Sequence, residues 1–440
     1  MPFVRPLKVV SVPRGHKGGP GGVHDCQESA RIGEFTVDEL VRIVKEMPRR
    51  RGTPELMRGL NRSIVVDAVR QHGTLSRADL VRFTSISPAS VSAIVADLIQ
   101  EGLVREVGRA PADIGRPGRL IQFSDNVLFL GCDLASAEGF RVGLMRLSGE
   151  LVESQVLAVP ARPPSPELVG KSLAEFVAEA ASRMASDRIV GAGIGVPGVV
   201  NPATGYVEIA PLLGWADVEL GEPLSDYLGM PVCVDNDVTF ALGAEVDRGA
   251  ASRASDVILV TFAEGVGGAV LLDGKIYRGR GAAGEIAYVV TETSGARQAL
   301  DGIGIFEGRL FQLVAEDARR DGIDPAQCEE QTARLVHLLE QSRGSVKFSE
   351  DIEAQLVATI AAALTSSIAL LDPEVVLLSG WIELAGEAML DRIIEQVRRL
   401  IHRMPAMQFS SVGDDRVVIG AALAASRATL ADVHVVEEAI

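Results

Sequence analysis

The hydrophobic pattern of the chain changes near residue 125, and this change limits the fold more than any other feature. Before it, from about Pro54, short amphipathic stretches recur with the spacing of helices, whereas after it apolar strand-like runs alternate with helical stretches. Strands that alternate with helices predict an α/β body of two halves, in which polar groups at strand ends meet in a cleft. A chain of 440 residues is also long enough for two or three domains.

We predict three parts from these patterns. Residues 1–54 form an N-terminal extension, Gly/Pro-rich apart from one amphipathic helix, Thr36–Met47. Residues 55–125 form a small α+β domain, and residues 126–440 form the α/β body. A basic stretch, Arg49–Arg51, is predicted to be part of a linker; contact of its arginines with a DNA backbone is an alternative, as is a start codon assigned too early.

The net charge of −16 is unevenly distributed. Residues 1–125 hold 19 Lys and Arg against 14 Asp and Glu, a net of +5, whereas the rest of the chain holds 24 against 45, a net of −21. Only residues 1–125 have a charge suited to binding a polyanion. Local contacts must supply that binding, because the net negative charge of the whole molecule opposes it. The sequence has no apolar run of about 18 residues, no signal-peptide core and no CxxC pair. We therefore expect a cytoplasmic protein with structural thiols and no membrane contact.

The segment after the extension carries local signals of three helices. A helical stripe of apolar residues covers Asn61–His72. Ser76 and Asp79 form a capping box, in which each side chain pairs with an otherwise unsatisfied backbone amide. Ser87 precedes Pro88, which is an N-cap followed by proline at the first helical position. Three short helices in this order predict a helix-turn-helix.

The third of these helices has an apolar face and an exposed face of small residues. Strand-like stretches at 103–107 and 114–123 add a β-hairpin, which makes the motif winged. Serine pairs with either type of base in the major groove and alanine contacts a thymine methyl, while wing arginines reach the minor groove or phosphates. A winged helix used for protein contacts is the alternative. The side chains predicted to contact DNA are Arg77, Ser87, Ala89, Ser90, Ser92, Arg116 and Arg119.

Segments of the body resemble one family in several independent motifs. They are GIGVPGVVNPATG, APLLGW, VCVDNDV, VGGAVLLDGKIYRGRGAAGEI, LDPEVVLLSG and VGDDRVVIGAALAA. They resemble the ROK family (repressor, open reading frame, kinase), and the front half is similar to the winged-helix part of its repressors. The resemblance spans most of residues 58–428. It implies an actin-like, hexokinase-like two-lobed body preceded by an α+β winged helix-turn-helix.

The resemblance also implies a sugar site. In the family's kinases the aspartate at the position of Asp237 is the catalytic base, and a neighbouring asparagine and a glutamate hold the sugar. A retained polar cluster that only stabilises the fold is the alternative for Asp237 and Glu285. The implied ligand-binding residues are Gly195, Pro197, Gly198, Asn236, Asp237, Glu285 and Tyr288.

Two departures from the family's pattern argue against a kinase. The first phosphate loop has become Asp133–Ala137 (DLASA), without the glycines and threonine that let amides approach phosphates. The second, Phe262–Gly268 (FAEGVGG), places Glu264 beside the phosphates. Like charges 4 Å apart cost about 4 kcal/mol at an effective dielectric near 20. We therefore predict no catalytic residue, although Asp237 keeps the position of the base.

The family's zinc site and part of its sugar site are also missing. Tyr288 replaces a histidine that is a ligand in both, Thr291–Gly304 holds none of the expected cysteines, and Leu212 replaces an asparagine that binds sugar. Zn²⁺ needs four N, S or O ligands, so we predict no metal and no cofactor. Each lost hydrogen bond weakens sugar binding by about 0.5–1.5 kcal/mol, which favours a less polar or modified sugar, or no effector.

The sequence as a whole predicts a bacterial DNA-binding transcription regulator, a repressor, controlled by a sugar-like effector in the cleft. It is expected to bind a double-stranded operator as a homodimer or a dimer of dimers. A sugar kinase with an appended DNA-binding domain and a ligand-independent regulator are the alternatives.

Overall fold

The computed structural model describes residues 54–109, 118–135, 139–159, 163–184, 186–291, 304–328 and 332–431. The helix predicted at Thr36–Met47, the basic Arg49–Arg51 stretch and the wing residue Arg116 lie outside the described residues, so these predictions stay untested.

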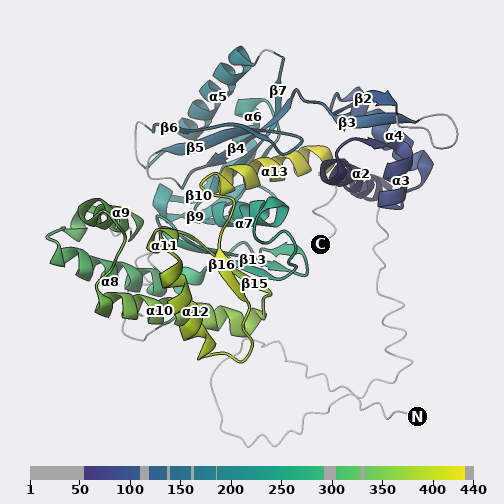
Figure 1. Ribbon diagram of the computed structural model, residues 1–440. Helices are drawn as coiled ribbons and strands as arrows, with labels where there is room; N and C mark the ends of the chain where they lie inside the picture. Colours follow the sequence, from purple (N-terminus) through teal and green to yellow (C-terminus); the bar gives the residue numbers. More distant parts are fainter. Residues whose placement is uncertain are drawn as a thin grey trace, which may run out of the picture. The chain divides into compact units, whose positions relative to one another are not determined.

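The first described module is a winged helix-turn-helix. Both predicted N-caps are confirmed: Ser76 and Asp79 form the capping box, and the Ser87 side chain accepts a hydrogen bond from the backbone amide of Ser90. The first strand was not predicted, because two residues become a strand only by pairing with β3. The elements are α2 (Pro54–His72), β1 (Leu75–Ser76), α3 (Arg77–Thr84), α4 (Pro88–Gln100), β2 (Val104–Arg109) and β3 (Arg119–Phe123), with the strands ordered β1-β3-β2 (Figure 1).

The first lobe of the body is a five-stranded mixed sheet in the order β11-β7-β4-β5-β6. A small antiparallel sheet, β10-β9-β8, adjoins it and precedes α6. The strands are β4 (Val127–Asp133), β5 (Phe140–Arg146), β6 (Leu151–Leu157), β7 (Arg188–Val196), β8 (Val199–Asn201), β9 (Tyr206–Ala210), β10 (Trp215–Glu219) and β11 (Val232–Asn236). The helices are α5 (Pro166–Arg183), η1 (Pro211–Leu213) and α6 (Gly221–Leu228).

The second lobe repeats the plan with a sheet in the order β14-β13-β12-β15-β16. Strands β12 and β13 form a hairpin, and the short strand β14 pairs with β13. The strands are β12 (Val257–Phe262), β13 (Val266–Leu272), β14 (Lys275–Tyr277), β15 (Val375–Gly380) and β16 (Ala406–Phe409). The helices are η2 (Ile286–Tyr288), α8 (Ile305–Arg320), η5 (Pro325–Cys328), α9 (Thr332–Arg343), α10 (Glu350–Leu371), α11 (Trp381–Ala385) and α12 (Glu387–Arg398).

Helices α7 (Asp237–Arg248) and α13 (Arg416–Ala431) lie against each other between the lobes. Helix α13 packs on β4 and β7, and α7 packs on β13 (Figure 1). Glycine allows this close approach, because a Cβ atom at Gly131 or Gly193 would lie only 2.0 or 2.1 Å from a carbonyl oxygen of α13. The two helices therefore form the layer through which the sheets of both lobes meet.

The winged helix shares one buried core with the body. Val66 and Val69 of α2 belong to the same apolar cluster as Leu423 of α13. Polar contacts reinforce this junction: Arg62 donates to the carbonyl oxygen of Leu430, and Arg70 donates to Ser426 Oγ at 2.8 Å. The DNA-binding module predicted from the sequence is thus joined to α13 by packing as well as by the chain.

Among the described helices, α10 is long and apolar enough to cross a membrane by length and composition. Its apolar side chains Ile352, Leu356, Ile360 and Leu364 are buried in the core of the second lobe, and it packs on α8 and α12. Its first turn carries three acidic side chains. A core helix accounts for these features.

Candidate ligand cavity and DNA-binding face

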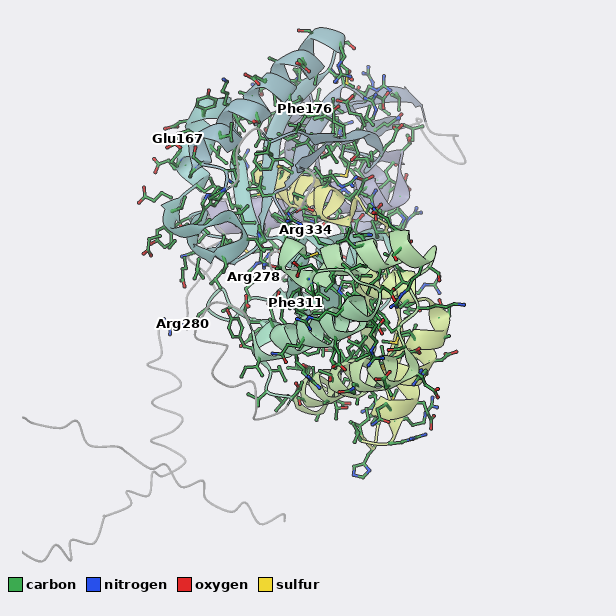
Figure 2. All side chains as sticks on the ribbon, turned by 90° about the vertical axis from the view of Figure 1, so that its left-hand side faces the viewer. Glu167, Phe176, Arg278, Arg280, Phe311 and Arg334 are labelled. Atoms are coloured by element: carbon green, nitrogen blue, oxygen red, sulfur yellow. The ribbon has the colours of Figure 1, made fainter. Side chains whose placement is uncertain are left out.

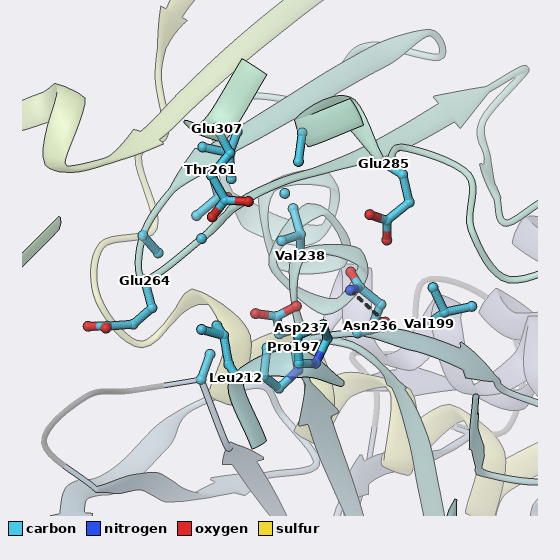
Figure 3. Close-up of a pocket in the computed structure, with 18 of the residues that line it drawn as sticks. Pro197, Val199, Leu212, Asn236, Asp237, Val238, Thr261, Glu264, Glu285 and Glu307 are labelled. Atoms are coloured by element: carbon cyan, nitrogen blue, oxygen red, sulfur yellow. Dashed lines mark hydrogen bonds between the residues drawn. The ribbon is translucent and has the colours of Figure 1, made fainter. Parts of the chain in front are cut away.

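A cavity of about 490 Å³ lies where the two lobes meet. Its walls come from the loop after β7, from η1, from the start of α7, from the β12–β13 turn and from η2. The predicted ligand residues Pro197, Gly198, Asn236, Asp237, Glu285 and Tyr288 all line it. Figure 3 labels four of them, Pro197, Asn236, Asp237 and Glu285. The fold therefore brings together residues that are up to 91 positions apart in the sequence.

Gly195 is the exception among the predicted ligand residues, because it does not line the cavity. It lies within β7, where an added Cβ would come within 2.7 Å of Val417 Cγ1 and 3.4 Å of Asp237 Cα. The structure gives it a packing position that lets α13 and the start of α7 approach the strand.

The end of β11 positions the first two polar residues of the cavity. Asn236 caps α7: its side-chain oxygen accepts from the amide of Thr239 at 3.0 Å, and its Nδ2 donates to Gly198 O at 3.1 Å. Asp237 follows as the first residue of α7. The amide of Asn236 therefore has one remaining N–H to offer a ligand, while Asp237 faces the cavity (Figure 3).

Glu285 reaches the cavity from the second lobe because of an unusual backbone at Gly284. This glycine has φ +95°, and a Cβ there would lie 2.3 Å from Gly268 O. The close approach anchors the segment on β13 just before Glu285. Figure 3 shows the Glu285 side chain directed toward Asn236 and Asp237 across the cavity.

Three carboxyl groups in or next to the cavity hold their protons unusually tightly. Burial, together with the nearby carboxyls of Asp133 and Glu285, raises the pKa of Asp237 to about 8. Burial raises the pKa of Asp133 to about 6 and that of Glu285 above its ordinary value. A protonated carboxyl both donates and accepts hydrogen bonds, which matches the hydroxyl groups of a polyol.

Glu307 is a cavity residue that the sequence reasoning missed. It lies in the first turn of α8, and burial raises its pKa to about 7, while hydrogen bonds from the amides of Gly304 and Val266 act in the opposite direction. A glutamate that follows a Gly-rich segment and opens a helix is the only local signal. Its approach to Glu285 depends on how α8 packs against η2.

In the two segments that correspond to the family's phosphate loops, backbone amides donate hydrogen bonds to the protein's own carboxyl groups. In the first, Ala135 N donates to Asp133 at 2.8 Å. In the second, the Val266 amide is bonded to Glu307. Backbone amides that bind a phosphate must be available to it, so these two contacts compete with a nucleotide.

The repulsion predicted for Glu264 is partly offset by the fold. Glu264 lines the cavity as expected, but the Arg334 guanidinium of α9 lies 3.6 Å from its carboxylate. A second arginine, Arg278, donates to Asp235 Oδ2 at 2.8 Å and ties β14 to β11 of the other lobe. Figure 2 shows both arginines at the level where the lobes meet. The sequence shows the carboxylate of Glu264 but not the cation that α9 places beside it.

No described group of three or more His, Cys, Asp and Glu side chains is arranged to hold a metal ion. The family's zinc does not fit the residues present: Tyr288 has no metal-binding nitrogen, and no cysteine stands at Thr291–Gly304, most of which lies outside the described residues.

The exposed face of α4 has the predicted character. Ser87, Ala89 and Ser92 are exposed and Ser90 is half-buried, while Val91 and Val95 fill the core beneath. Ser87 and Ser90 also bind each other, with 2.9 Å between their hydroxyl oxygens. The hydroxyls of Ser87 and Ser90 thus take part in the N-cap of α4. Among the serines predicted to contact DNA, Ser92 is the one whose hydroxyl has no part in this cap.

Two of the predicted DNA-binding arginines share one carboxylate. Arg77 at the start of α3 lies 3.0 Å from Glu106 of β2, and Arg119 at the start of β3 also donates to Glu106. These hydrogen bonds hold the pKa of Glu106 below its ordinary value. Glu106 was not singled out in the sequence, because only the sheet places it between the two arginines.

The fold and the cavity define a class: a winged-helix DNA-binding module on a two-lobed, sugar-kinase-like body. The model of the ROK family matches residues 135–428, and the model of the MarR family, of the winged-helix type, matches residues 60–113. The chain belongs to the ROK family.

Relatives and solved structures agree with this assignment. The xylose repressor of Caldicellulosiruptor bescii is 21% identical, over 79% of this chain and 90% of its own. The DNA-binding transcriptional dual regulator NagC of Escherichia coli K12 is 24% identical, over 86% and 95%. A ROK family transcriptional regulator described as a homologue of the E. coli MLC protein has a TM-score of 0.67 at 23% identity, covering 86% of this chain and 97% of that one. A Streptomyces griseus ROK glucokinase has a TM-score of 0.56 at 24% identity, covering 68% and 99%. The structural likenesses show the fold.

Proposed function

We propose that the protein is a DNA-binding transcriptional repressor whose operator affinity is set by a sugar-like effector in the cavity. The observation that carries this is a continuous path of packed elements. Asp237 in the cavity is the first residue of α7, α7 packs along α13, and α13 shares its core with α2 of the winged helix. If these packed elements adopt two conformations, an effector that binds one of them more tightly shifts the equilibrium between them. The operator affinity then changes by at most the difference in the effector's binding free energy for the two conformations.

The cavity is proposed to bind without phosphoryl transfer. The amides of Ala135 and Val266 are held by Asp133 and Glu307, which supports the loss of nucleotide binding that the sequence predicts. Asp237 keeps the position of the base, but a raised pKa near 8 also suits a group that donates to a sugar hydroxyl. The proposal extends to a cytoplasmic homodimer, since two winged helices match a palindromic operator.

The test uses the full chain and an operator selected from random-sequence duplexes. We expect tight binding to the selected DNA and at least a tenfold change when xylose, N-acetylglucosamine or another sugar of a panel is added. ATP with each sugar should yield no ADP above background. Sugar-dependent ADP formation that disappears in Asp237→Ala would support the kinase alternative. Operator binding that no sugar changes would support the ligand-independent alternative.

Replacing Glu106 with Gln is expected to tighten DNA binding by about three- to tenfold. The substitution frees Arg77 and Arg119 from their shared carboxylate, so that both can pair with phosphates. Each added phosphate contact steepens the slope of log K against log salt by about 0.9. Fluorescence anisotropy at several salt concentrations measures both quantities. The control Glu222→Gln removes the same charge from an exposed position on α6. Equal behaviour of the two variants would show that the arginines do not contact DNA.

A further inference from the structure

The cavity is lined by apolar side chains as well as by carboxyl groups. In Figure 3, Pro197, Val199 and Leu212 of the first lobe lie on the same side as Asn236 and Asp237, opposite Glu285 and Glu307 of the second lobe. The apolar lining continues along β9 and η1, where Ile209 and Leu212 also line the space. A polyol alone would satisfy the carboxyl groups and leave the apolar lining in contact with water.

The exposed apolar side chains are not needed by the core of the first lobe. In β9 and η1, Val207, Ala210 and Leu213 point inward and are at most 1% exposed. Their neighbours Ile209 and Leu212 remain 47% and 36% exposed and line the cavity. Large apolar side chains gathered beside a cavity mark surface that a ligand covers.

Tyr288 adds an aromatic ring to the cavity lining from the second lobe. It is 44% exposed and lines the cavity beside Glu285. Its ring stands where the family's kinases carry a polar histidine, and Leu212 stands where they carry an asparagine. Both changes replace a polar group that binds a sugar hydroxyl in the family by a more apolar side chain.

The volume agrees with a ligand larger than one sugar ring. A pyranose with twelve non-hydrogen atoms fills about 180 Å³, if each atom takes roughly half of the 30 Å³ of a liquid water molecule. The cavity offers about 490 Å³.

We propose that the effector is a glycoside with an apolar aglycone. The sugar ring contacts the carboxyl groups of Asp237, Glu285 and Glu307, and the aglycone covers Ile209, Leu212 and Tyr288. This rests on the proposed function, because it names the ligand class of the same site.

Calorimetry and thermal shift with the full chain test the proposal. The probes are xylose, glucose and N-acetylglucosamine, each as the free sugar, the methyl β-glycoside and the 4-nitrophenyl β-glycoside, with 4-nitrophenol as a blank. For at least one sugar we expect the nitrophenyl glycoside to bind ten or more times tighter than the methyl glycoside. Asp237→Ala should abolish binding of both forms.

Leu212→Asn tests whether the apolar lining of the cavity contacts the aglycone. It should lower the ratio of nitrophenyl to methyl affinity at least fivefold without weakening the methyl glycoside. Leu370→Asn, at a leucine of α10 that is 84% exposed and does not line the cavity, is the matched control and should leave the ratio unchanged. Melting temperatures of both variants report folding.

The outcomes distinguish the inference from the function on which it rests. Methyl and nitrophenyl glycosides that bind equally, or a preference that Leu212→Asn leaves intact, overturn the inference and leave the sugar-controlled repressor standing. Operator binding without any response to sugars or glycosides overturns both.

Discussion

Replacing Ser92 with Glu is expected to lower operator affinity more than 100-fold, a loss of about 2.7 kcal/mol. Ser92 lies on the exposed face of α4, and we propose that this face enters the major groove as the second helix of a helix-turn-helix does. A carboxylate there meets the phosphate backbone and the acceptor-rich base edges without a hydrogen bond to offer. Because the side chain is exposed, the fold should tolerate the change.

The measurement compares operator binding by anisotropy with thermal unfolding of the same variant. Ala358→Glu places the same new charge at an exposed position of α10 and serves as the control. We expect the control to bind the operator within about threefold of the parent, since exposed charges separated by more than a Debye length of about 10 Å are largely screened. Retained affinity in Ser92→Glu would show that another surface binds DNA.

Replacing Glu245 with Ala is expected to destabilise the protein by about 3–5 kcal/mol, because it removes a buried charge and leaves its partners unpaired. Glu245 of α7 is fully buried. Its carboxylate accepts from Ala250 N at 2.7 Å, Ser411 N at 2.8 Å and Val412 N at 2.9 Å, and also from the hydroxyls of Ser410 and Ser411. These bonds fasten α7 to the loop that leads into α13.

The same carboxylate predicts a dependence of stability on pH. Burial raises the pKa of Glu245, but the hydrogen bonds outweigh burial and leave the pKa below its ordinary value. The unfolded chain therefore binds this proton more readily, so the stabilisation is present above the unfolded pKa of about 4.3 and is lost as the pH falls through the folded pKa.

Urea unfolding at several pH values tests both statements. The parent should lose stability more steeply than Glu245→Ala as the pH falls below about 4.3. The control Glu222→Ala, at an exposed site of α6, should change stability by less than about 1 kcal/mol. A Glu245→Ala variant as stable as this control would mean that the loop finds other acceptors.

The local features of the winged helix could be predicted because they depend on neighbours in the sequence. Ser76 with Asp79, and Ser87 with Pro88, form their caps within one turn, as the structure confirms. The short strand β1 could not be predicted, because Leu75 and Ser76 pair with β3 some 45 residues later.

The candidate cavity was predicted only in part. Asp237 and Glu285 lie in family motifs, whereas Glu307 lies outside them, and its approach to the cavity follows from the packing of α8 on η2. Gly195 belongs to a motif and yet serves packing. A motif identifies the segment, whereas the side chains that reach the cavity depend on elements that meet across the chain.

The sequence by itself determined the helix caps and the order of the modules, because caps depend on residues within one turn and the modules differ in hydrophobic periodicity. Its resemblance to the ROK family determined the fold of the body. The tertiary structure decided where the charges are balanced. It placed Glu106 between two arginines, Arg334 beside Glu264, and Glu307 on the Val266 amide. Coulomb and hydrogen-bond energies depend on distance in space, which the order of residues does not specify.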